Sequence, residues 1–428
     1  MILRKDFFMK NQKTKKIFSI VSFCLVAIMS VSLIGTLFAG SSFGGDTSSN
    51  KKPSNTVTPS TNTIFGVSWD RTESTALNRL TTYNDFFVTT NITEEPVAGV
   101  GNTAGSSQFD NYYPWNAMKE YNVIDNKIAY SSDDEEFSRT EYDTVVYIPT
   151  FYYRVVDNGT SRKYYISAEA FPGFVVHPGS NNYVGKYSVS SDYTSVSGRE
   201  PVTAVTRANI RVNAMAKGEN WSQFDYATWN AIQLLYLVEY ADFDSQAKIG
   251  RGVVDSTALG FARAPQNTGG CDTMVYHTGS AEGPEGYSQI QYRYIEGLWG
   301  NCCEWVDGIN SYDGNIFIST DYKSYADDTE AGYTFSGVIL PATGHIKNVG
   351  HSTVFPWAFI PSESILTTDY SVPMYVPDKV CNGSGWRVLY TSNNADGDSL
   401  AGLFRFSMSS KSDRIESSFG GRLVFHGE

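Results

Sequence analysis

The feature that most constrains the fold of this chain is a series of short β-like segments that begins near Ile64 and continues to the C-terminus. Such segments are rich in Val, Ile, Tyr, Phe and Thr and are separated by Gly, Asn, Asp or Ser, a pattern typical of strands joined by turns. The clearest pair is residues 144–156 and 162–171, with Asn158 and Gly159 between them. Because an Asn-Gly dipeptide favours a tight turn, we expect these two segments to form a β-hairpin.

Two segments with helical signals interrupt this pattern. The first begins at Thr206, a good N-cap residue, and stops at Gly218, a residue that commonly ends helices. The second runs from Asp225 to Phe243, and its apolar residues recur over successive turns, which predicts an amphipathic helix. Two helices followed by strands and long loops predict an α+β fold that is β- and loop-rich and has two main helices.

The N-terminal residues differ in composition from the rest of the chain. Residues 1–16 carry six Lys or Arg and one acidic residue, and residues 17–40 contain no charged residue. An uncharged segment of this length can cross a hydrocarbon core of about 30 Å as a helix. We therefore expect a cytoplasmic basic segment, a single transmembrane anchor at 17–40 and a C-terminus displayed at the cell surface. The alternative is a cleaved signal sequence ending near Ala39, which would make the protein secreted.

Composition also predicts how the chain after residue 40 is organised. Residues 41–63 are rich in Ser, Thr, Asn and Pro and predict a flexible linker. Beyond the linker we expect a small β-rich domain at 64–140 and a larger α+β domain at 141–428. The formal net charge of −12 argues against a nucleic-acid partner.

Several motifs, taken in order, resemble the C-type-lectin-like fold in its formylglycine-generating-enzyme form. Residues 220–236, "NWSQFDYATWNAIQLLY", stand where that fold carries its long helix, and 297–308, "GLWGNCCEWVDG", is similar to the Gly-Asn-Val-Trp-Glu-Trp-Val signature. Residues 383–387 and 420–424 resemble the closing strands of the family. The whole run from residue 64 to the end also resembles phage and prophage surface proteins of Firmicutes, some of which are variable proteins of diversity-generating retroelements.

This resemblance implies a function and two alternatives. It implies a non-enzymatic, surface-displayed protein with a C-type-lectin-like ligand-binding domain at 141–428. The C-terminal face of this domain would bind an extracellular protein or a glycan. In diversified relatives this face is encoded by codons whose adenines are randomised. One alternative is a formylglycine-generating-type oxidase, which uses a thiol pair with copper or a histidine-rich iron site. The other is a structural or adhesion protein associated with a phage tail.

The cysteines bear on the enzymatic alternative. Cys302 and Cys303 replace the Val-Trp of the family signature, which is a packing position. Adjacent residues on a strand point to opposite faces, so we expect one thiol to face the core and the other a neighbouring layer or solvent. Buried small hydrophobic residues are the favoured interpretation; a disulfide, with each other or with Cys271 or Cys381, and a catalytic role are the alternatives.

Metal binding has little support in the sequence. The five histidines show none of the short His or Cys spacings typical of metal sites. Two oxygen-rich segments, 131–136 and 393–399, have the look of calcium loops but lack the ligand spacing of an EF-hand, so turns are the favoured interpretation. We expect no metal ligand and no cofactor, with calcium the one ion considered.

The candidate ligand-binding residues lie in polar segments near the C-terminus. Framework strands expected at 386–390, 401–406 and 421–425 bracket segments without apolar periodicity, and loops on a rigid scaffold are common binding surfaces. We predict no catalytic residue. The predicted ligand-binding residues are Tyr390, Ser392, Asn393, Asn394, Asp396, Asp398, Arg405, Ser407, Ser409, Ser410, Ser412, Asp413 and Arg414.

Overall fold

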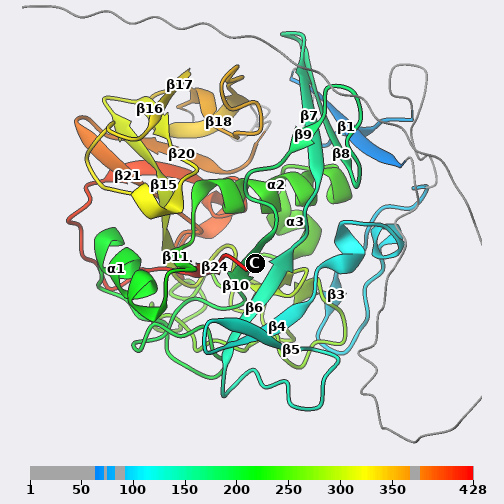
Figure 1. Ribbon diagram of the computed structural model, residues 1–428, viewed down its shortest axis with the longest axis vertical. Coiled ribbons are helices and arrows are strands. Elements are labelled where there is room, and N and C mark those ends of the chain that lie inside the picture. The colour runs from blue at the N-terminus through cyan, green and yellow to red at the C-terminus, as the bar shows by residue number, and fades with distance from the viewer. Residues whose placement is uncertain (1–62, 72–74, 82–91, 367–375, 428) are drawn as a thin grey trace, which may run out of the picture. The chain divides into compact units, whose positions relative to one another are not determined.

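Four β-sheets surround one long buried helix in the part of the chain that the structure describes (Figure 1). The computed structural model describes residues 63–71, 75–81, 92–366 and 376–427. All of these residues belong to one compact unit, residues 57–428.

Both expected helices are present: the first has the expected start and end, whereas the second starts as expected but ends at Tyr240 and not at Phe243. Helix α1 (Arg207–Lys217) begins after Thr206, whose side chain accepts a hydrogen bond from the Asn209 N–H, and ends at Gly218. Helix α2 (Tyr226–Tyr240) begins after Asp225, which caps it by accepting from the Thr228 N–H. The chain also forms a short helix α3 and four single-turn 3-10 helices: α3 (Ser245–Ile249), η1 (Gln108–Asn111), η2 (Trp115–Ala117), η3 (Tyr322–Ser324) and η4 (Asp398–Leu400).

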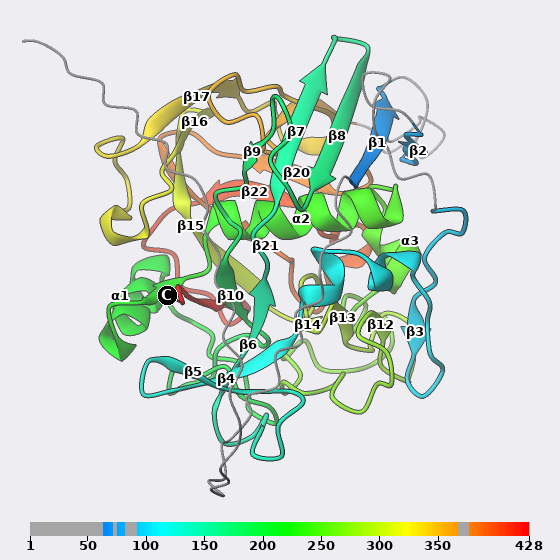
Figure 2. The ribbon, with the colours of Figure 1, turned by 45° about the vertical axis from the view of Figure 1, so that its right-hand side comes forward.

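The sequence predicted that helix α2 is amphipathic, but this prediction is wrong, because the helix is buried on every side. All fifteen of its residues are buried, the polar Thr228, Gln233 and Glu239 among them. Figure 2 shows it crossing the middle of the molecule, with β7 (Tyr152–Asp157) and β8 (Ser161–Ser167) on one side. A helix enclosed in this way needs partners for its charged and amide side chains, and distant segments supply them: Gln233 donates to the Leu403 carbonyl and Glu239 pairs with Arg293.

The first two sheets pack on opposite sides of α2. β7 and β8 are the predicted hairpin, which is confirmed, and they belong to a five-stranded sheet of order β2-β1-β8-β7-β9. The second sheet has the order β11-β24-β10-β6-β4-β5. The remaining strands of these sheets are β1 (Ile64–Asp70), β2 (Asn78–Arg79), β9 (Val175–Val176), β4 (Glu120–Ile124), β5 (Lys127–Ser131), β6 (Asp143–Ile148), β10 (Asn182–Gly185), β11 (Trp221–Gln223) and β24 (Leu423–Phe425).

The other two sheets carry the C-terminal half of the chain. A small sheet has the order β14-β13-β12-β3, and the largest has the order β17-β16-β15-β21-β22-β20-β18-β19, with β23 paired to β15. Their strands are β3 (Gly99–Val100), β12 (Gly279–Ser280), β13 (Ile290–Tyr292), β14 (Ile295–Glu296), β15 (Cys303–Tyr312), β16 (Asn315–Ile318), β17 (Thr334–Ile339), β18 (Gly344–Val349), β19 (Pro361–Ile365), β20 (Lys379–Asn382), β21 (Trp386–Thr391), β22 (Phe406–Ser410) and β23 (Phe419–Gly420).

The predicted α+β class is wrong. Helices account for only 13% of the described residues, and the described chain is mostly β. The abundance of strands was expected. The prediction overestimated the helical share of the chain, because loops and short strands make up nearly everything outside α1 and α2. The resemblance to the C-type-lectin-like family stays a prediction.

The expected localisation also needs correction. None of the helices in the described residues is long and apolar enough to cross a bilayer. This finding contradicts the expected single-pass, membrane-anchored protein at the cell surface. The segments on which that expectation rested, residues 1–16 and 17–40, lie outside the described residues, as does the expected linker up to residue 62.

The division expected at residue 140 runs through shared sheets. Strand β1 pairs along its whole length with β8, and β4 pairs with β6. Strand β3 pairs with β12, which lies about 180 residues later in the chain. Segments 64–140 and 141–428 therefore share three of the four sheets.

Candidate ligand-binding site

The predicted ligand-binding residues lie on β21 and β22 and on the loops that follow these strands. Exposure divides them into two sets. The exposed or half-buried set, which can contact a ligand, is Asn393, Asn394, Asp396, Asp398, Ser409, Ser412, Asp413 and Arg414. The buried set is Tyr390, Ser392, Arg405, Ser407 and Ser410.

Three of the predicted residues form a chain of hydroxyl groups that reaches the surface. Tyr390 pairs with Ser407 across β21 and β22. The Tyr390 Oη lies 3.3 Å from the Ser409 Oγ, which lies 3.2 Å from the Ser407 Oγ. Ser407 is fully buried and Ser409 is exposed, so Ser409 forms the outer end of the chain. Because a hydroxyl group can rotate to donate or to accept a hydrogen bond, Ser409 can pair with either a donor or an acceptor of a ligand.

The loop after β22, residues 411–417, is the most exposed part of the predicted site. Each of its residues is exposed or half-buried. The Arg414 guanidinium pairs with Glu416 and lies 5.7 Å from the ring centroid of Phe419. The Ala204 N–H donates to the Glu416 carbonyl (3.0 Å), which ties the loop to the segment before α1. The loop is therefore held at its base while its tip faces solvent.

The strands beneath this loop are tightly buried. Phe406 and Met408 in β22 are 1% and 0% exposed, and Phe419 in β23 is 4% exposed. The rings of Tyr390 and Phe419 meet edge to face at 4.7 Å. Packing of this density fixes the strand positions, so side chains in the loop can change with little effect on the core.

The loop after β21, residues 392–400, is engaged with the protein itself. The Asp396 carboxylate accepts from the Thr257 N–H at 2.8 Å and from its hydroxyl at 2.6 Å. Asp398 pairs with Arg251 at 2.6 Å. The Asn394 Oδ1 accepts from the Asp396 N–H (3.0 Å), an Asx turn. The oxygen atoms of this loop thus have partners within the chain, and the described residues contain no group of three or more His, Cys, Asp or Glu placed to hold a metal ion.

Three of the predicted residues stabilise the backbone or lie in the core instead of facing a ligand. The Ser392 Oγ donates to the Gly300 carbonyl at 3.0 Å, and the Arg405 Nη1 donates to the Leu400 carbonyl at 3.1 Å. Ser410 is 1% exposed. The sequence prediction treated every polar residue in the C-terminal segments alike, whereas alternation along β22 turns some of them inward.

The thiols are buried in the described chain. Cys271, Cys302, Cys303 and Cys381 are all free. The Cys302 Sγ points to the Ser418 carbonyl (3.4 Å), and Cys303 packs in an apolar cluster with Trp305. Burial raises the pKa of Cys302 and raises that of Cys303 to about 12. The reactive thiolate form is therefore disfavoured at both positions.

Glu304, in the signature segment, forms a buried ion pair. Its Oε1 lies 2.9 Å from the Arg422 Nη2, and the Ser188 Oγ donates to it at 2.7 Å. Arg422 also donates to the carbonyls of Gly185 and Lys186 at 2.7 and 2.8 Å. This pair joins β15 to the end of β10 and has a structural role.

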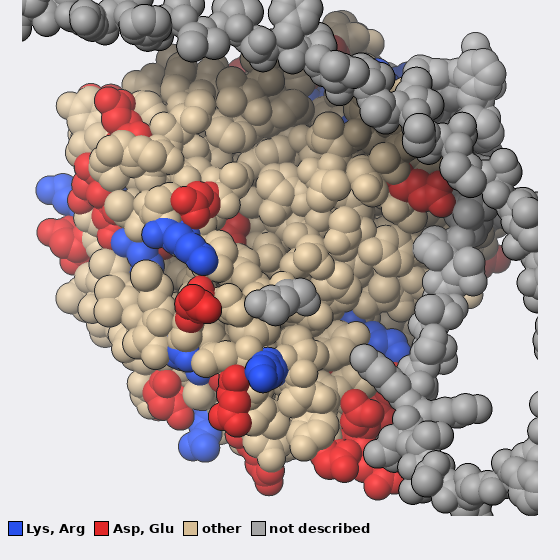
Figure 3. All heavy atoms as spheres, viewed as in Figure 1, with Lys and Arg blue, Asp and Glu red and all other residues tan. Residues whose placement is uncertain are grey.

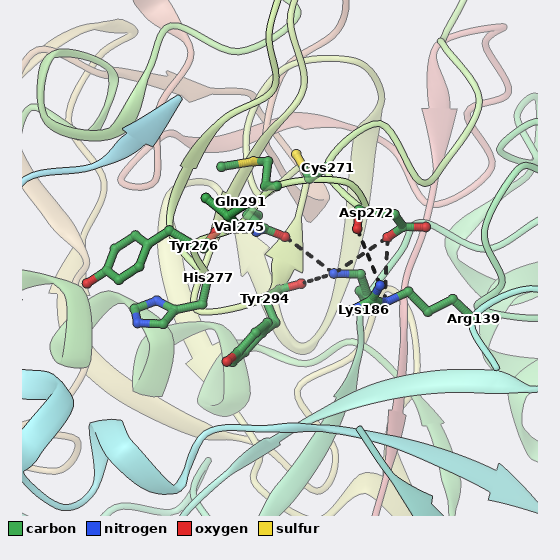
Figure 4. A pocket seen from close by; sticks show the side chains of 10 residues that line it. Arg139, Lys186, Cys271, Asp272, Val275, Tyr276, His277, Gln291 and Tyr294 are labelled. Atoms are coloured by element: carbon green, nitrogen blue, oxygen red, sulfur yellow. Dashed lines mark hydrogen bonds and ion pairs between the residues drawn. The ribbon is translucent and has the colours of Figure 1, made fainter. Parts of the chain in front are cut away.

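A second polar site, which the sequence did not predict, is a cavity of about 110 Å³ (Figure 4). It lies among the loop that contains Asp272, the small sheet and the segment after β10. Ten residues line it: Arg139, Lys186, Cys271, Asp272, Met274, Val275, Tyr276, His277, Gln291 and Tyr294. They come from four distant parts of the sequence, so no local motif could have indicated the cavity.

Charged residues are unevenly spread over the face shown in Figure 3. Lys, Arg, Asp and Glu gather around α1 and near β4 and β5, and the two signs are interspersed around α1. The middle and upper part of this face is formed mainly by uncharged residues. Interspersed signs produce no extended field of one sign on this face.

Comparisons with known proteins leave the family open. Neither the models of known protein families nor the curated proteins include a match to this chain.

Proposed function

We propose that this chain is a non-enzymatic ligand-binding protein whose ligand contacts the exposed loop 411–417 and the neighbouring hydroxyl of Ser409. The ligand is a protein or a glycan. Two arguments support this proposal: the exposure of the loop 411–417 and Ser409, and the resemblance of the C-terminal motifs to variable proteins of diversity-generating retroelements.

The observation that carries this proposal is the contrast between the loop and its base. Residues 411–417 are exposed or half-buried, whereas Met408 and Phe419, on either side of the loop, are 0% and 4% exposed. A polar loop on a rigid β scaffold is a common binding arrangement, because its side chains can vary without disturbing the core. Arg414, Asp413 and Ser409 offer a cation, an anion and a hydroxyl within this surface.

The enzymatic alternative has less support. Thiol oxidation requires a thiol that the substrate or a metal ion can reach, and Cys302 and Cys303 are 1% and 2% exposed. Copper-dependent oxidation of a thiol substrate by the purified protein would restore this alternative.

The direct test is a binding screen with the full chain and two variants. The probes are a printed array of defined glycans and a library of displayed peptides. The site variant replaces Ser409, Asp413 and Arg414 with alanine. The control variant replaces Glu135 and Glu136, two exposed residues after β5, with alanine.

We expect binders that the wild-type and control proteins retain and that the site variant loses by at least about tenfold, the equivalent of 1.4 kcal/mol. Binders retained equally by all three proteins would show that the ligand site lies elsewhere. Sequencing the 3′ end of the gene in several isolates adds an independent test. A near-copy of codons 386–425 that differs only at adenines, beside a reverse-transcriptase gene, would support a diversified binding loop.

A further inference from the structure

Lys186, directly after β10, is a buried amine that contacts two carboxylates. It is 1% exposed. Its Nζ lies 3.2 Å from the Glu120 Oε1 and 3.8 Å from the Asp272 Oδ1. It also donates to the Tyr294 carbonyl at 2.9 Å. Lysine is almost never buried to this degree without a specific partner, and here two acids from different segments lie beside it.

The two carboxylates are held in different ways. Glu120 accepts from the Arg139 Nε at 2.9 Å and from its Nη2 at 2.6 Å, a paired ionic contact. Burial by itself would raise the pKa of Glu120, but Lys186 and Arg139 outweigh it and hold that pKa below its usual value. Glu120 is therefore ionised, and its Oε1 lies close enough to the ammonium to accept one of its protons.

Asp272 is bound by two hydroxyl groups. The Tyr187 Oη donates to its Oδ1 and the Ser197 Oγ to its Oδ2, both at 2.5 Å. The two hydroxyls hold the carboxyl group in one orientation. They can also donate to the negative charge that builds up on its oxygens when an amine adds to its carbon.

We propose that Lys186 and Asp272 join through an intramolecular amide bond, with Glu120 as the group that transfers the protons. This modification is independent of the ligand-binding function proposed above.

The chemistry balances without an oxidant or a co-reactant. Lys186 starts as an ammonium and Asp272 as a carboxylate. Glu120 takes one ammonium proton, and the free amine attacks the Asp272 Cγ to form the Nζ–Cγ bond. The nitrogen of the adduct passes a second proton to the Asp272 oxygen that departs, and Glu120 returns the first. That oxygen then leaves as water with two of the three ammonium hydrogens, and the third stays on the amide nitrogen. A neutral amide replaces one positive and one negative charge.

The surroundings favour this reaction. The attack brings together two groups that the fold already holds in place, which removes most of the entropic cost of a bimolecular step. Removing a buried ion pair also removes the cost of keeping both charges out of water. The cavity shown in Figure 4 adjoins Lys186 and Asp272, so the amine has room to approach and the water has a place to go.

The test is mass spectrometry of the purified full chain. We expect an intact mass lower than the sequence mass by one water molecule. Trypsin does not cleave after an acylated lysine, so residues 164–199 remain uncut at Lys186. These residues are then recovered in a branched product with residues 264–293, which contain Asp272.

Three variants separate this bond from other losses of water. Lys186→Arg keeps the positive charge but lacks the amine, and we expect its full sequence mass. Asp272→Asn supplies an amide as the acceptor, so we expect the loss of ammonia instead of water. Glu120→Gln keeps the shape of the side chain but cannot take the proton, and we expect it to accumulate as the uncoupled chain. Circular dichroism confirms that each variant is folded.

Any of three results would overturn the proposal. The first is an unmodified wild-type mass in the folded protein. The second is a loss of water that persists in the folded Lys186→Arg variant. The third is a branch that maps to Glu120 instead of Asp272, which would exclude the acceptor assigned here.

Discussion

At the scale of single residues, buried cations organise the interior. Lys186, Arg207, Arg293 and Arg422 are each at most 2% exposed. Each has a carboxylate partner: Arg422 pairs with Glu304, and the others pair with Glu120, Asp327 and Glu239. Because a buried charge that loses its partner keeps the whole cost of leaving water, these pairs are costly to break.

The pair of Glu304 and Arg422 gives a direct test of this cost. Glu304→Gln removes the anion but keeps the size of the side chain, and it leaves Arg422 buried with a neutral neighbour. We expect the free energy of unfolding to fall by about 3–5 kcal/mol in urea denaturation. The matched control is Glu363→Gln, which breaks the ion pair between Glu363 and Lys347. In this pair the side chain of Lys347 is 45% exposed and that of Glu363 is 51% exposed. The control should change stability by less than about 1 kcal/mol, and equal losses in both variants would contradict the argument.

Asp378 predicts a pH dependence of stability. Burial raises its pKa from 3.8 to about 8, although the Phe404 N–H donates to it at 2.7 Å. The folded chain therefore keeps a proton that the unfolded chain releases above about pH 4. The stability contributed by this group is fully present below pH 3.8 and is lost as the pH rises towards 8.

Asp378→Asn should remove this loss, because the amide oxygen can still accept from Phe404 and carries no charge. We expect the variant to be about 1–3 kcal/mol more stable than the wild type at pH 8 and about equal to it at pH 4. Thermal unfolding across this range measures the difference. Asp125→Asn, at an exposed turn, is the control and should follow the wild-type curve. A stability difference for Asp378→Asn that does not change with pH would contradict the raised pKa.

At the scale of elements, local signals located the helices but not their surroundings. Thr206, Gly218 and Asp225 mark helix ends through contacts with their own neighbours, so the sequence was sufficient to find them. The polar residues of α2 resembled a solvent face, but their partners come from distant segments. Gln233 donates to the Leu403 carbonyl and Glu239 pairs with Arg293. No spacing within α2 could have shown this.

The same limit applies to the two sites. The exposure of Ser409 and of the loop 411–417 was predictable, because a polar run between strand-like segments is a local pattern; their role in binding a ligand stays a prediction. The cavity beside Lys186 was not, because Glu120, Arg139 and Asp272 approach Lys186 only through the fold. In the same way, the burial of both Ser407 and Ser410 depends on the segments that pack around β22, which the sequence does not indicate locally.

The contrast between β22 and its loop predicts different tolerances to mutation. Met408→Ala removes a side chain that is 0% exposed and should cost about 2–5 kcal/mol. Asp413→Ala and Ile415→Ser change exposed residues of the loop and should each alter stability by less than about 0.5 kcal/mol. Chemical denaturation of the three variants measures these values. A large loss from the loop variants would show that the loop is part of the scaffold and would count against it as a variable binding surface.

At the scale of the whole molecule, the sheets join segments that are far apart in the sequence. Strand β24, near the C-terminus, lies between β11 and β10. Strand β1 pairs with β8, and β3 pairs with β12. Sequence patterns indicate where strands occur but not which strands pair, and for this reason the boundary expected at residue 140 did not anticipate the shared sheets.

This topology predicts that the C-terminal part cannot fold alone. A fragment of residues 141–428 lacks β1, β3, β4 and β5, as well as Trp69 and Trp115, which are both fully buried. It also lacks Glu120 and Arg139, which form a paired ionic contact beside the buried Lys186. We expect this fragment to be insoluble or to lack a cooperative thermal transition. A protein of residues 57–428 should instead unfold in one cooperative step, and circular dichroism measures both transitions. A cooperative transition in the 141–428 fragment would show that it is an independent domain and that the shared sheets contribute little to its stability.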